Sequence, residues 1–134
     1  MSCDGAARGN PGPAGIGAVI ATRSGEVLDT VARGIGETTN NVAEYTAALE
    51  GLRRAARLGA VDVLLRSDSH LLIQQLIGRY RVKAEHLKPL HAQVMAEVRR
   101  FARVRFEHVP RERNTEADRL ANAGVDAWLA DRRR

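Results

Sequence analysis

The sequence predicts an α/β fold, which some schemes would class as α+β, built on a five-stranded mixed sheet with helices on both faces. Two observations predict it. Strand-like segments separated by turn residues fill the first third of the chain, as in antiparallel strands. Segments with helical spacing of apolar residues then alternate with short apolar runs, which favours parallel strands joined through helices. The expected order of elements is βββαβααβα.

Glycine, proline and asparagine divide the first third of the chain into strands. Gly9-Asn10-Pro11-Gly12-Pro13 is a dense turn signal, and Arg23-Ser24-Gly25-Glu26 is a second one. Only three residues precede Asp4, so we expect a short first strand that holds Asp4 with few ladder hydrogen bonds. The strands expected around the turns are the start of the chain up to Asp4, Ile16–Ala21 and Val27–Ile35.

Helices and strands alternate in the rest of the chain. We expect a helix capped by Asn40 or Asn41 and ended by Gly59. Val61–Leu65 is a continuous apolar run, the pattern of a strand covered on both faces, and the helix before it implies a parallel connection. The remaining expected elements are helices at Ser69–Ile77, Ala84–Phe101 and Thr115–Leu129, a strand at Val104–Val109 and a frayed tail at Arg132–Arg134.

Length and composition fit one domain. The 134 residues, 44% of them hydrophobic, suffice for a core, so we expect a single domain spanning residues 1–134. No apolar run approaches the roughly 20 residues that cross a bilayer, and we expect a cytoplasmic protein with no membrane partner. The single cysteine, Cys3, is expected to be a small buried residue. The net charge of +5 is compatible with a polyanionic partner, although charge that serves only solubility is an equal alternative.

Four carboxylates carry the functional signal. Acids at the carboxyl edge of one sheet can converge on divalent metal ions. Singly, each acid also has an ordinary role as a turn residue, a charge on a helix dipole, a helix cap or part of a solvated helical face. Those roles do not explain why all four acids occur where predicted strands end or helices begin, so the pattern favours a metal site. The four are Asp4, Glu44, Asp68 and Asp118.

Four short segments surround these acids in order along the chain. They are Asp4-Gly5 with Arg8-Gly9-Asn10-Pro11-Gly12-Pro13-Ala14-Gly15, then Thr39-Asn40-Asn41-Val42-Ala43-Glu44, then Ser67-Asp68-Ser69, and Asn114-Thr115-Glu116-Ala117-Asp118-Arg119-Leu120-Ala121. Together they resemble type 1 ribonuclease H, and the match spans nearly the whole chain. The chain is most similar to the short bacterial and archaeal forms that lack a basic protrusion, including the ribonuclease H domain of actinobacterial bifunctional ribonuclease H/phosphatase proteins.

The resemblance implies a ribonuclease H-like fold and endonucleolytic hydrolysis of the RNA strand of RNA/DNA hybrids, with 5′-phosphate and 3′-hydroxyl products. It implies two Mg²⁺ or Mn²⁺ ions held by the four acids. In that scheme Asp4 bridges the ions, and Glu44 holds one ion and reaches the ribose 2′-hydroxyl. Asp68 completes the site and Asp118 ligates at its rim.

The resemblance also implies contacts with the hybrid. It places Asn10 and the segment Thr39-Asn40-Asn41 against the minor groove and a DNA phosphate, with turn formation and helix capping as the local alternatives. It places Tyr80, which lies among the cations of Arg79–Lys83, against the DNA strand. A charged loop between helices is the alternative interpretation of that basic segment.

Two positions depart from the family pattern. Many members have a histidine in the loop before the last helix, and that loop is Pro110-Arg111-Glu112-Arg113-Asn114 here. We expect Arg111 or Arg113 to contact phosphate in its place, since a guanidinium is always charged, and we expect His108 to be a strand residue. His70 stands where many relatives have glutamine, which puts that groove contact in doubt.

Three other interpretations stay open at this point. The same four acids would serve an enzyme that also cuts double-stranded RNA. A non-catalytic or weakly active module that binds hybrids or double-stranded RNA is a second alternative, and a fragment of a larger protein is a third. No protein partner is implied, and we expect a monomer.

Overall fold

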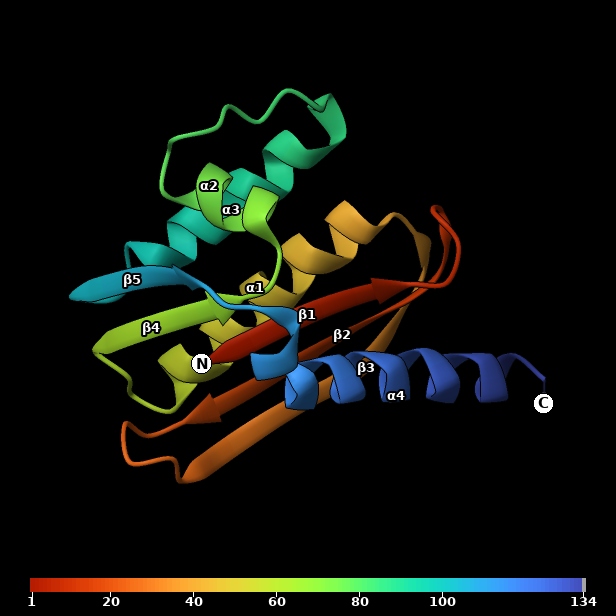
Figure 1. Ribbon diagram of the computed structural model, residues 1–134, viewed down its shortest axis with the longest axis horizontal. Coiled ribbons are helices and arrows are strands. Elements are labelled where there is room, and N and C mark those ends of the chain that lie inside the picture. Colours follow the sequence, from red (N-terminus) through yellow and green to blue (C-terminus); the bar gives the residue numbers. More distant parts are fainter. Residues whose placement is uncertain (134) are drawn as a thin grey trace.

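The computed structural model describes residues 1–133, and within them a mixed sheet runs in the order β3-β2-β1-β4-β5. The three N-terminal strands are antiparallel, and β4 and β5 add in parallel, as the sequence predicts. The strands are β1 (Ser2–Ala7), β2 (Gly12–Ala21), β3 (Val27–Thr38), β4 (Asp62–Ser67) and β5 (Arg103–His108). The helices are α1 (Asn40–Arg57), α2 (His70–Leu76), α3 (Lys88–Val98) and α4 (Thr115–Arg132) (Figure 1).

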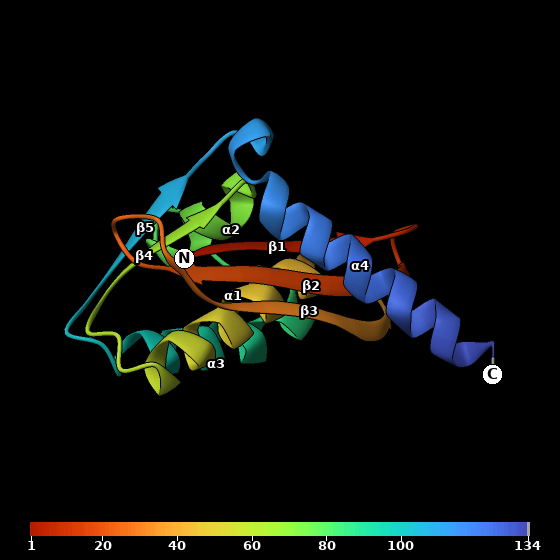
Figure 2. The same cartoon turned by 90° about the horizontal axis from the view of Figure 1, so that it is seen from below.

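Helices cover both faces of this sheet, which confirms the predicted layering. Figure 2 shows α4 on one side and α1 and α3 on the other. The core between α1 and the sheet includes Tyr45, Leu52 and Leu65, each at most 2% exposed. Cys3 is fully buried there, as expected. Among residues 1–133, no helix has both the length and the apolar character that a membrane crossing requires.

Glycines let both helices lie directly on the strands. A Cβ on Gly17 of β2 would stand 2.2 Å from the carbonyl oxygen of Ala117 in α4. On the opposite face, a Cβ on Gly5 of β1 would stand 2.3 Å from the carbonyl carbon of Ala43 in α1. No side chain fits into either contact, so the backbones of α1 and α4 rest on the centre of the sheet.

The first helix and the first turn differ from the prediction. Thr39, rather than Asn40 or Asn41, caps α1, because its hydroxyl accepts a hydrogen bond from the Val42 backbone N–H at 3.3 Å. The predicted turn at residues 9–13 was too long. Strand β2 already begins at Gly12, since the Arg8 N–H donates to the Pro13 carbonyl at 2.8 Å and continues the hairpin ladder.

The second half of the chain shows three further differences. The predicted helix at Ala84–Phe101 is a 3₁₀ turn at Glu85–Leu87 followed by the shorter α3. In β4 the side chains alternate, with Val63 and Leu65 buried and Leu64 only half-buried, so the strand is not covered equally on both faces. Helix α4 continues to Arg132, which pairs with Glu37 at 3.2 Å instead of fraying. Arg134 lies outside the described residues.

Strand β1 is anchored unequally by its two neighbours. All six of its residues pair with β2, and Asp4 lies in the middle of the strand opposite Gly17 rather than at its end. On the β4 side the register contains only Ser2 opposite Arg66, and the N-terminal amine donates to the Leu64 carbonyl at 2.6 Å. The expected shortage of ladder hydrogen bonds therefore applies to the β4 side alone.

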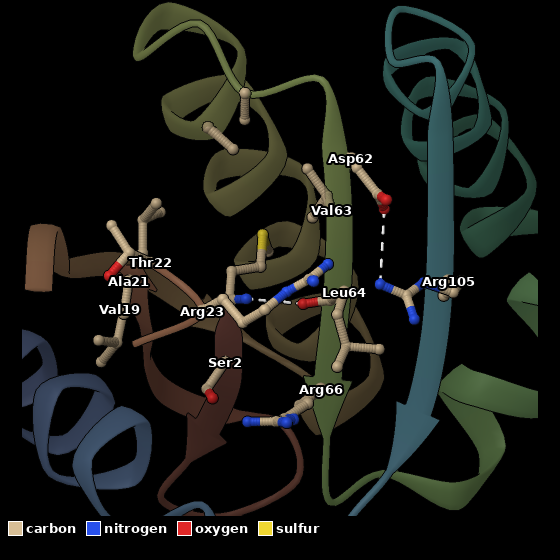
Figure 3. A pocket seen from close by; sticks show the side chains of 14 residues that line it. Ser2, Val19, Ala21, Thr22, Arg23, Asp62, Val63, Leu64, Arg66 and Arg105 are labelled. Carbon is tan, nitrogen blue, oxygen red and sulfur yellow. Dashed lines mark hydrogen bonds and ion pairs between the residues drawn. The ribbon is translucent and has the colours of Figure 1, made fainter. Parts of the chain in front are cut away.

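Beyond the first residue of β1, its two neighbours continue without it. Strand β2 runs on to Ala21 and β4 starts at Asp62, and the strands flank a pocket of about 250 Å³. Figure 3 shows Val19 on one side of this pocket and Val63 and Leu64 on the other. The pocket lies at the end of the sheet opposite the carboxyl ends of β1 and β4.

The close approach of α4 to β2 leads us to expect a loss of stability when Gly17 is replaced. Gly17→Ala should lower the free energy of unfolding by about 1–3 kcal/mol, because the new methyl group forces the helix backbone away from the strand. Urea denaturation measures this loss. Gly51→Ala is the matched control, since its Cβ would press on the end of the flexible Met1 side chain and would otherwise stand in ordinary contact with the Ala18 Cβ at 3.4 Å. Equal stability of the two variants would contradict the proposed contact.

Candidate active site

Three of the four acids come together at the carboxyl ends of the parallel strands. Asp4 projects from β1, Glu44 is the fifth residue of α1, and Asp68 directly follows β4. Each acid offers one carboxylate oxygen to the cluster, and these three oxygens lie within 4.8 Å of one another. Ser2 is opposite Arg66 in the parallel ladder, so Asp4, two residues further on, is level with Asp68. The register of β1 and β4 therefore sets the cluster.

Asp118 lies outside this cluster but lines the same pocket, which has a volume of about 390 Å³. It sits in the first turn of α4, where its backbone N–H donates to the Asn114 carbonyl at 3.1 Å. The buried Asn114 amide donates to the carbonyl of Cys3 at 2.9 Å and so ties the start of α4 to β1 beside Asp4. Asn114 had not been singled out from the sequence, although it belongs to the same short segment as Asp118.

The cluster repels itself electrostatically. Burial, together with the charge of Glu44, raises the pKa of Asp4 to about 9. Burial, together with the charge of Asp68, raises the pKa of Glu44 to about 8, although the Gly5 N–H donates to its Oε2 at 3.3 Å. Without a counter-charge, these two acids therefore retain protons near neutral pH. A bound cation would instead favour the deprotonated form of both acids.

The donor set fits a divalent metal. Hard cations such as Mg²⁺ prefer oxygen ligands at about 2.1 Å, and several carboxylate oxygens this close together can be bridged at that distance. Asp4 has Glu44 and Asp68 as its partners in the cluster, and it is the most deeply buried of the three. The residues present thus match the chemistry that the sequence predicts for them.

The predicted groove residues join the first hairpin to the start of α1. The Asn10 side-chain carbonyl accepts from the Asn40 backbone N–H at 3.1 Å, and the Asn40 side-chain carbonyl accepts from the Ala7 N–H at 3.0 Å. Asn40 and Asn41 both line the acidic pocket, whereas the Thr39 hydroxyl is occupied by capping. These residues therefore do serve in the turn and in the helix cap, and the same contacts hold Asn40 and Asn41 at the acidic pocket.

A basic pocket lies beside the acidic one and shares Asn41 with it. Its volume is about 490 Å³, and Tyr80 in its wall is 47% exposed. The Tyr80 ring packs edge to face on His70 at the start of α2, with 5.8 Å between ring centroids. The cations that line this pocket are Arg79, Arg81 and Lys83.

The loop before α4 brings one of its two arginines to the acids. The Arg111 Nε lies 3.8 Å from an Asp68 carboxylate oxygen and lines the acidic pocket. Arg113 is exposed and does not line it. His108 is the last residue of β5, as expected, and its Nε2 lies 3.3 Å from the Asp68 carbonyl oxygen. This contact between His108 and the Asp68 backbone was not predicted.

Comparison with known proteins identifies the family. The "Reverse transcriptase-like" family model matches residues 2–124. The bifunctional protein Rv2228c of Mycobacterium tuberculosis is 47% identical over 95% of this chain and 35% of its own length. The solved structure of the N-terminal ribonuclease H domain of that protein, fused to maltose-binding protein, is 45% identical in sequence, with a TM-score of 0.90 over 93% of this chain and 99% of the matched chain. The chain belongs to the ribonuclease H family.

Two other members of the ribonuclease H family are similar over most of this chain. Ribonuclease HI of Halobacterium salinarum is 39% identical over 92% of this chain and 62% of its own length. The structure of LC11-RNase H1 in complex with an RNA/DNA hybrid is 41% identical, with a TM-score of 0.91 over 96% of both chains. The chain thus spans about a third of the Mycobacterium protein and under two thirds of the Halobacterium enzyme.

The crowded acids predict how stability depends on pH. The pKa values of Asp4 and Glu44 are higher in the folded chain than the roughly 4 of an unfolded one, so the metal-free fold binds extra protons. Its stability should fall as the pH rises from about 5 to about 8. Mg²⁺ replaces those protons, so it should raise the melting temperature more at pH 8 than at pH 5.5, by on the order of 5 °C.

Thermal unfolding with and without Mg²⁺ at the two pH values tests this expectation. Asp4→Asn removes one of the repelling groups, so the metal-free variant should be more stable than wild type at pH 8 and respond less to Mg²⁺. A metal-free melting temperature that rises towards pH 8, or an equal Mg²⁺ effect at both pH values, would contradict the electrostatic account.

Proposed function

We propose that this chain is an endonuclease that hydrolyses the RNA strand of RNA/DNA hybrids and leaves 5′-phosphate and 3′-hydroxyl ends. The observation that carries the proposal is the convergence of the Asp4, Glu44 and Asp68 carboxylates within 4.8 Å, with Asp118 in the same pocket. Membership of the ribonuclease H family supports it. So does the 41% identity to LC11-RNase H1, whose structure was determined with a bound hybrid.

The proposed metal ligands are the four acids, with Asp4 between two Mg²⁺ or Mn²⁺ ions. Such a pair, when bound, supplies an activated water and stabilises the leaving 3′-oxygen. Asp4 would be the ligand that both ions share, because β2 holds it in mid-strand and oxygens of Glu44 and Asp68 lie within 4.8 Å of its own. Asp68 completes the cluster, and Asp118 approaches from α4 at the rim of the pocket.

The RNA strand is proposed to be recognised by its 2′-hydroxyl. Glu44 is well placed for this role, because the Gly5 N–H fixes its Oε2 while the side chain faces the acidic pocket. Asn40 and Asn41 line the same pocket, Asn10 is hydrogen-bonded to Asn40, and Thr39 precedes Asn40 in the chain. These four residues would contact the minor groove and a DNA phosphate. The 2′-hydroxyl distinguishes RNA from DNA in such a groove.

The DNA strand is proposed to lie over the basic pocket. Tyr80 offers a half-exposed ring for packing against a sugar, and the surrounding cations would meet phosphates. Arg111, beside Asp68, is proposed to contact phosphate next to the reacting bond, and the exposed Arg113 to contact a phosphate further along. The two pockets meet at Asn41, so one duplex could occupy both.

We propose that residues 1–134 form a monomeric catalytic domain that works in the cytoplasm. The acids, the groove residues and the basic pocket all come from this one chain, so no second copy is needed to complete the site. The single buried thiol, Cys3, has no disulfide to form and suits a reducing compartment.

Cleavage of a labelled RNA/DNA hybrid, beside matching duplex RNA and duplex DNA, tests the proposal in Mg²⁺, Mn²⁺ or chelator. Metal-dependent cutting of the hybrid's RNA strand is expected. Asp4→Asn should reduce cleavage by on the order of 1,000-fold or more, because several kcal/mol of transition-state stabilisation depend on the metals, and should leave hybrid binding intact.

Asp62→Asn is the matched control, since Asp62 is an acid at the far end of β4 that pairs with Arg103. It should cleave like wild type. Retained cleavage in Asp4→Asn would contradict the two-metal mechanism. Tight hybrid binding without any cleavage by wild type would favour a binding module, and equal cutting of duplex RNA would extend the substrate range.

A further inference from the structure

Asp118 is held by a neighbour one turn further along α4. The Asn122 side-chain amide nitrogen lies 3.0 Å from the Asp118 carbonyl oxygen and 3.4 Å from its carboxylate Oδ1. One side chain thus contacts both the backbone and the carboxylate of this acid. The other three acids sit on β1, on α1 and directly after β4, and their oxygens already cluster within the site. Asp118 also contacts Asp4, and the Asn122 amide adds a contact to its carboxylate from within its own helix.

The same asparagine is also held from the first hairpin. The Nη2 of Arg8 donates to the Asn122 side-chain oxygen at 3.3 Å and lies 3.4 Å from its carbonyl oxygen. The Nη1 of Arg8 donates to Asp126, a further turn along α4, at 2.7 Å. The guanidinium fork therefore contacts two successive turns of the helix. A fork of this kind orients its partners better than the single ammonium of a lysine would.

Arg8 lies two residues from Asn10 on the hairpin that joins β1 to β2. On its other side this hairpin is attached to α1 through hydrogen bonds of Asn40 with the Asn10 side chain and the Ala7 backbone N–H. The hairpin is therefore attached to both helices that carry active-site acids. A continuous chain of hydrogen bonds runs from Asp118 through Asn122 and Arg8 to the part of the protein that would meet the minor groove.

The ion pair between Arg8 and Asp126 contributes too little to folding stability to explain this arrangement by itself. The side chains of Arg8 and Asp126 are 42% and 67% exposed, and exposed pairs contribute about 0–1 kcal/mol. Asn122 is partly buried, and its amide uses its donor on Asp118 and its acceptor on Arg8. A partner that orients a metal ligand in this way typically changes metal affinity or activity by about 10- to 100-fold when removed.

We propose that Asn122 and Arg8 are positioning residues that orient the Asp118 carboxylate and couple it to the hairpin carrying Asn10. This inference rests on the proposed function, because it assigns Asp118 to the metal site and the hairpin to the hybrid. Asn122 acts on the metal site directly. Arg8 links that site to the hairpin, so binding of the hybrid strengthens binding of the metal, and by reciprocity metal strengthens binding of the hybrid.

Mn²⁺ titration by calorimetry, with and without a non-cleavable hybrid, tests the positioning role independently of turnover. Asn122→Ala should weaken Mn²⁺ binding by about 10-fold while its circular dichroism stays that of wild type. Asn122→Asp retains an acceptor for Arg8 but lacks the donor and adds a like charge beside Asp118, so it should weaken Mn²⁺ binding at least as much. Asn122→Gln, which retains the amide, should recover part of the affinity.

Arg8→Met should affect the coupling between hybrid and Mn²⁺ binding rather than Mn²⁺ binding itself. Mn²⁺ affinity without hybrid should stay within about 3-fold of wild type, while the enhancement of Mn²⁺ binding by the hybrid is lost and the KM for hybrid rises by about 10-fold. Arg8→Lys should rescue little, because one ammonium cannot contact both turns of α4. Arg103→Ala is the matched control, since it removes a 2.7 Å ion pair to Asp62 at the other end of the sheet.

The outcomes separate this inference from the proposed function. Mn²⁺ affinity and hybrid coupling in the Asn122 and Arg8 variants equal to those of Arg103→Ala would overturn the positioning role, even if wild type cleaves hybrids. Absence of hybrid cleavage by wild type would remove the proposed function, and the calorimetric comparison would still decide whether Asn122 orients a metal ligand. A uniform loss of melting temperature without a change in metal affinity would show a purely structural contact and would also overturn the inference.

Discussion

The site depends on the confinement of three carboxylates within 4.8 Å at the ends of β1 and β4. This arrangement is unfavourable by itself, because burial and like charge both raise the pKa values of Asp4 and Glu44. The fold maintains it through backbone geometry, since the strand register makes Asp4 level with Asp68 and the absence of a side chain at Gly5 lets α1 bring Glu44 alongside. A bound divalent cation would offset this repulsion between the carboxylates.

Helix α4 brings the fourth acid to the site from the opposite face of the sheet. The glycine contacts with β2 set the distance between α4 and the sheet. The hydrogen bond from Asn114 to the Cys3 carbonyl fixes the position of the start of α4 along β1. The first hairpin then connects α4 to α1 through Arg8 and Asn10. Residues that would bind metal and residues that would bind nucleic acid are therefore parts of one connected structure. A displacement of one group should shift the position of the other.

Much of this was predictable from the sequence, because the order of elements and the four acidic segments depend on local pattern. The predictions that were wrong concern features that depend on contacts between distant parts of the chain. Asp4 lies in mid-strand because pairing with β2 continues past it into the glycines, and Thr39 rather than an asparagine caps α1 because Asn40 bonds to the hairpin instead. The contacts of Asn122 with Arg8 and of His108 with Asp68 join residues far apart in the chain, and no local spacing signals them.

The most direct test of the central claim is a crystal structure with Mn²⁺ and a non-cleavable RNA/DNA hybrid, analysed by anomalous scattering. The account predicts two manganese peaks about 4 Å apart, with Asp4 contacting both and the scissile phosphate of the RNA strand between them. Anomalous peaks away from these acids, or a hybrid whose RNA strand lies outside the acidic pocket, would contradict it.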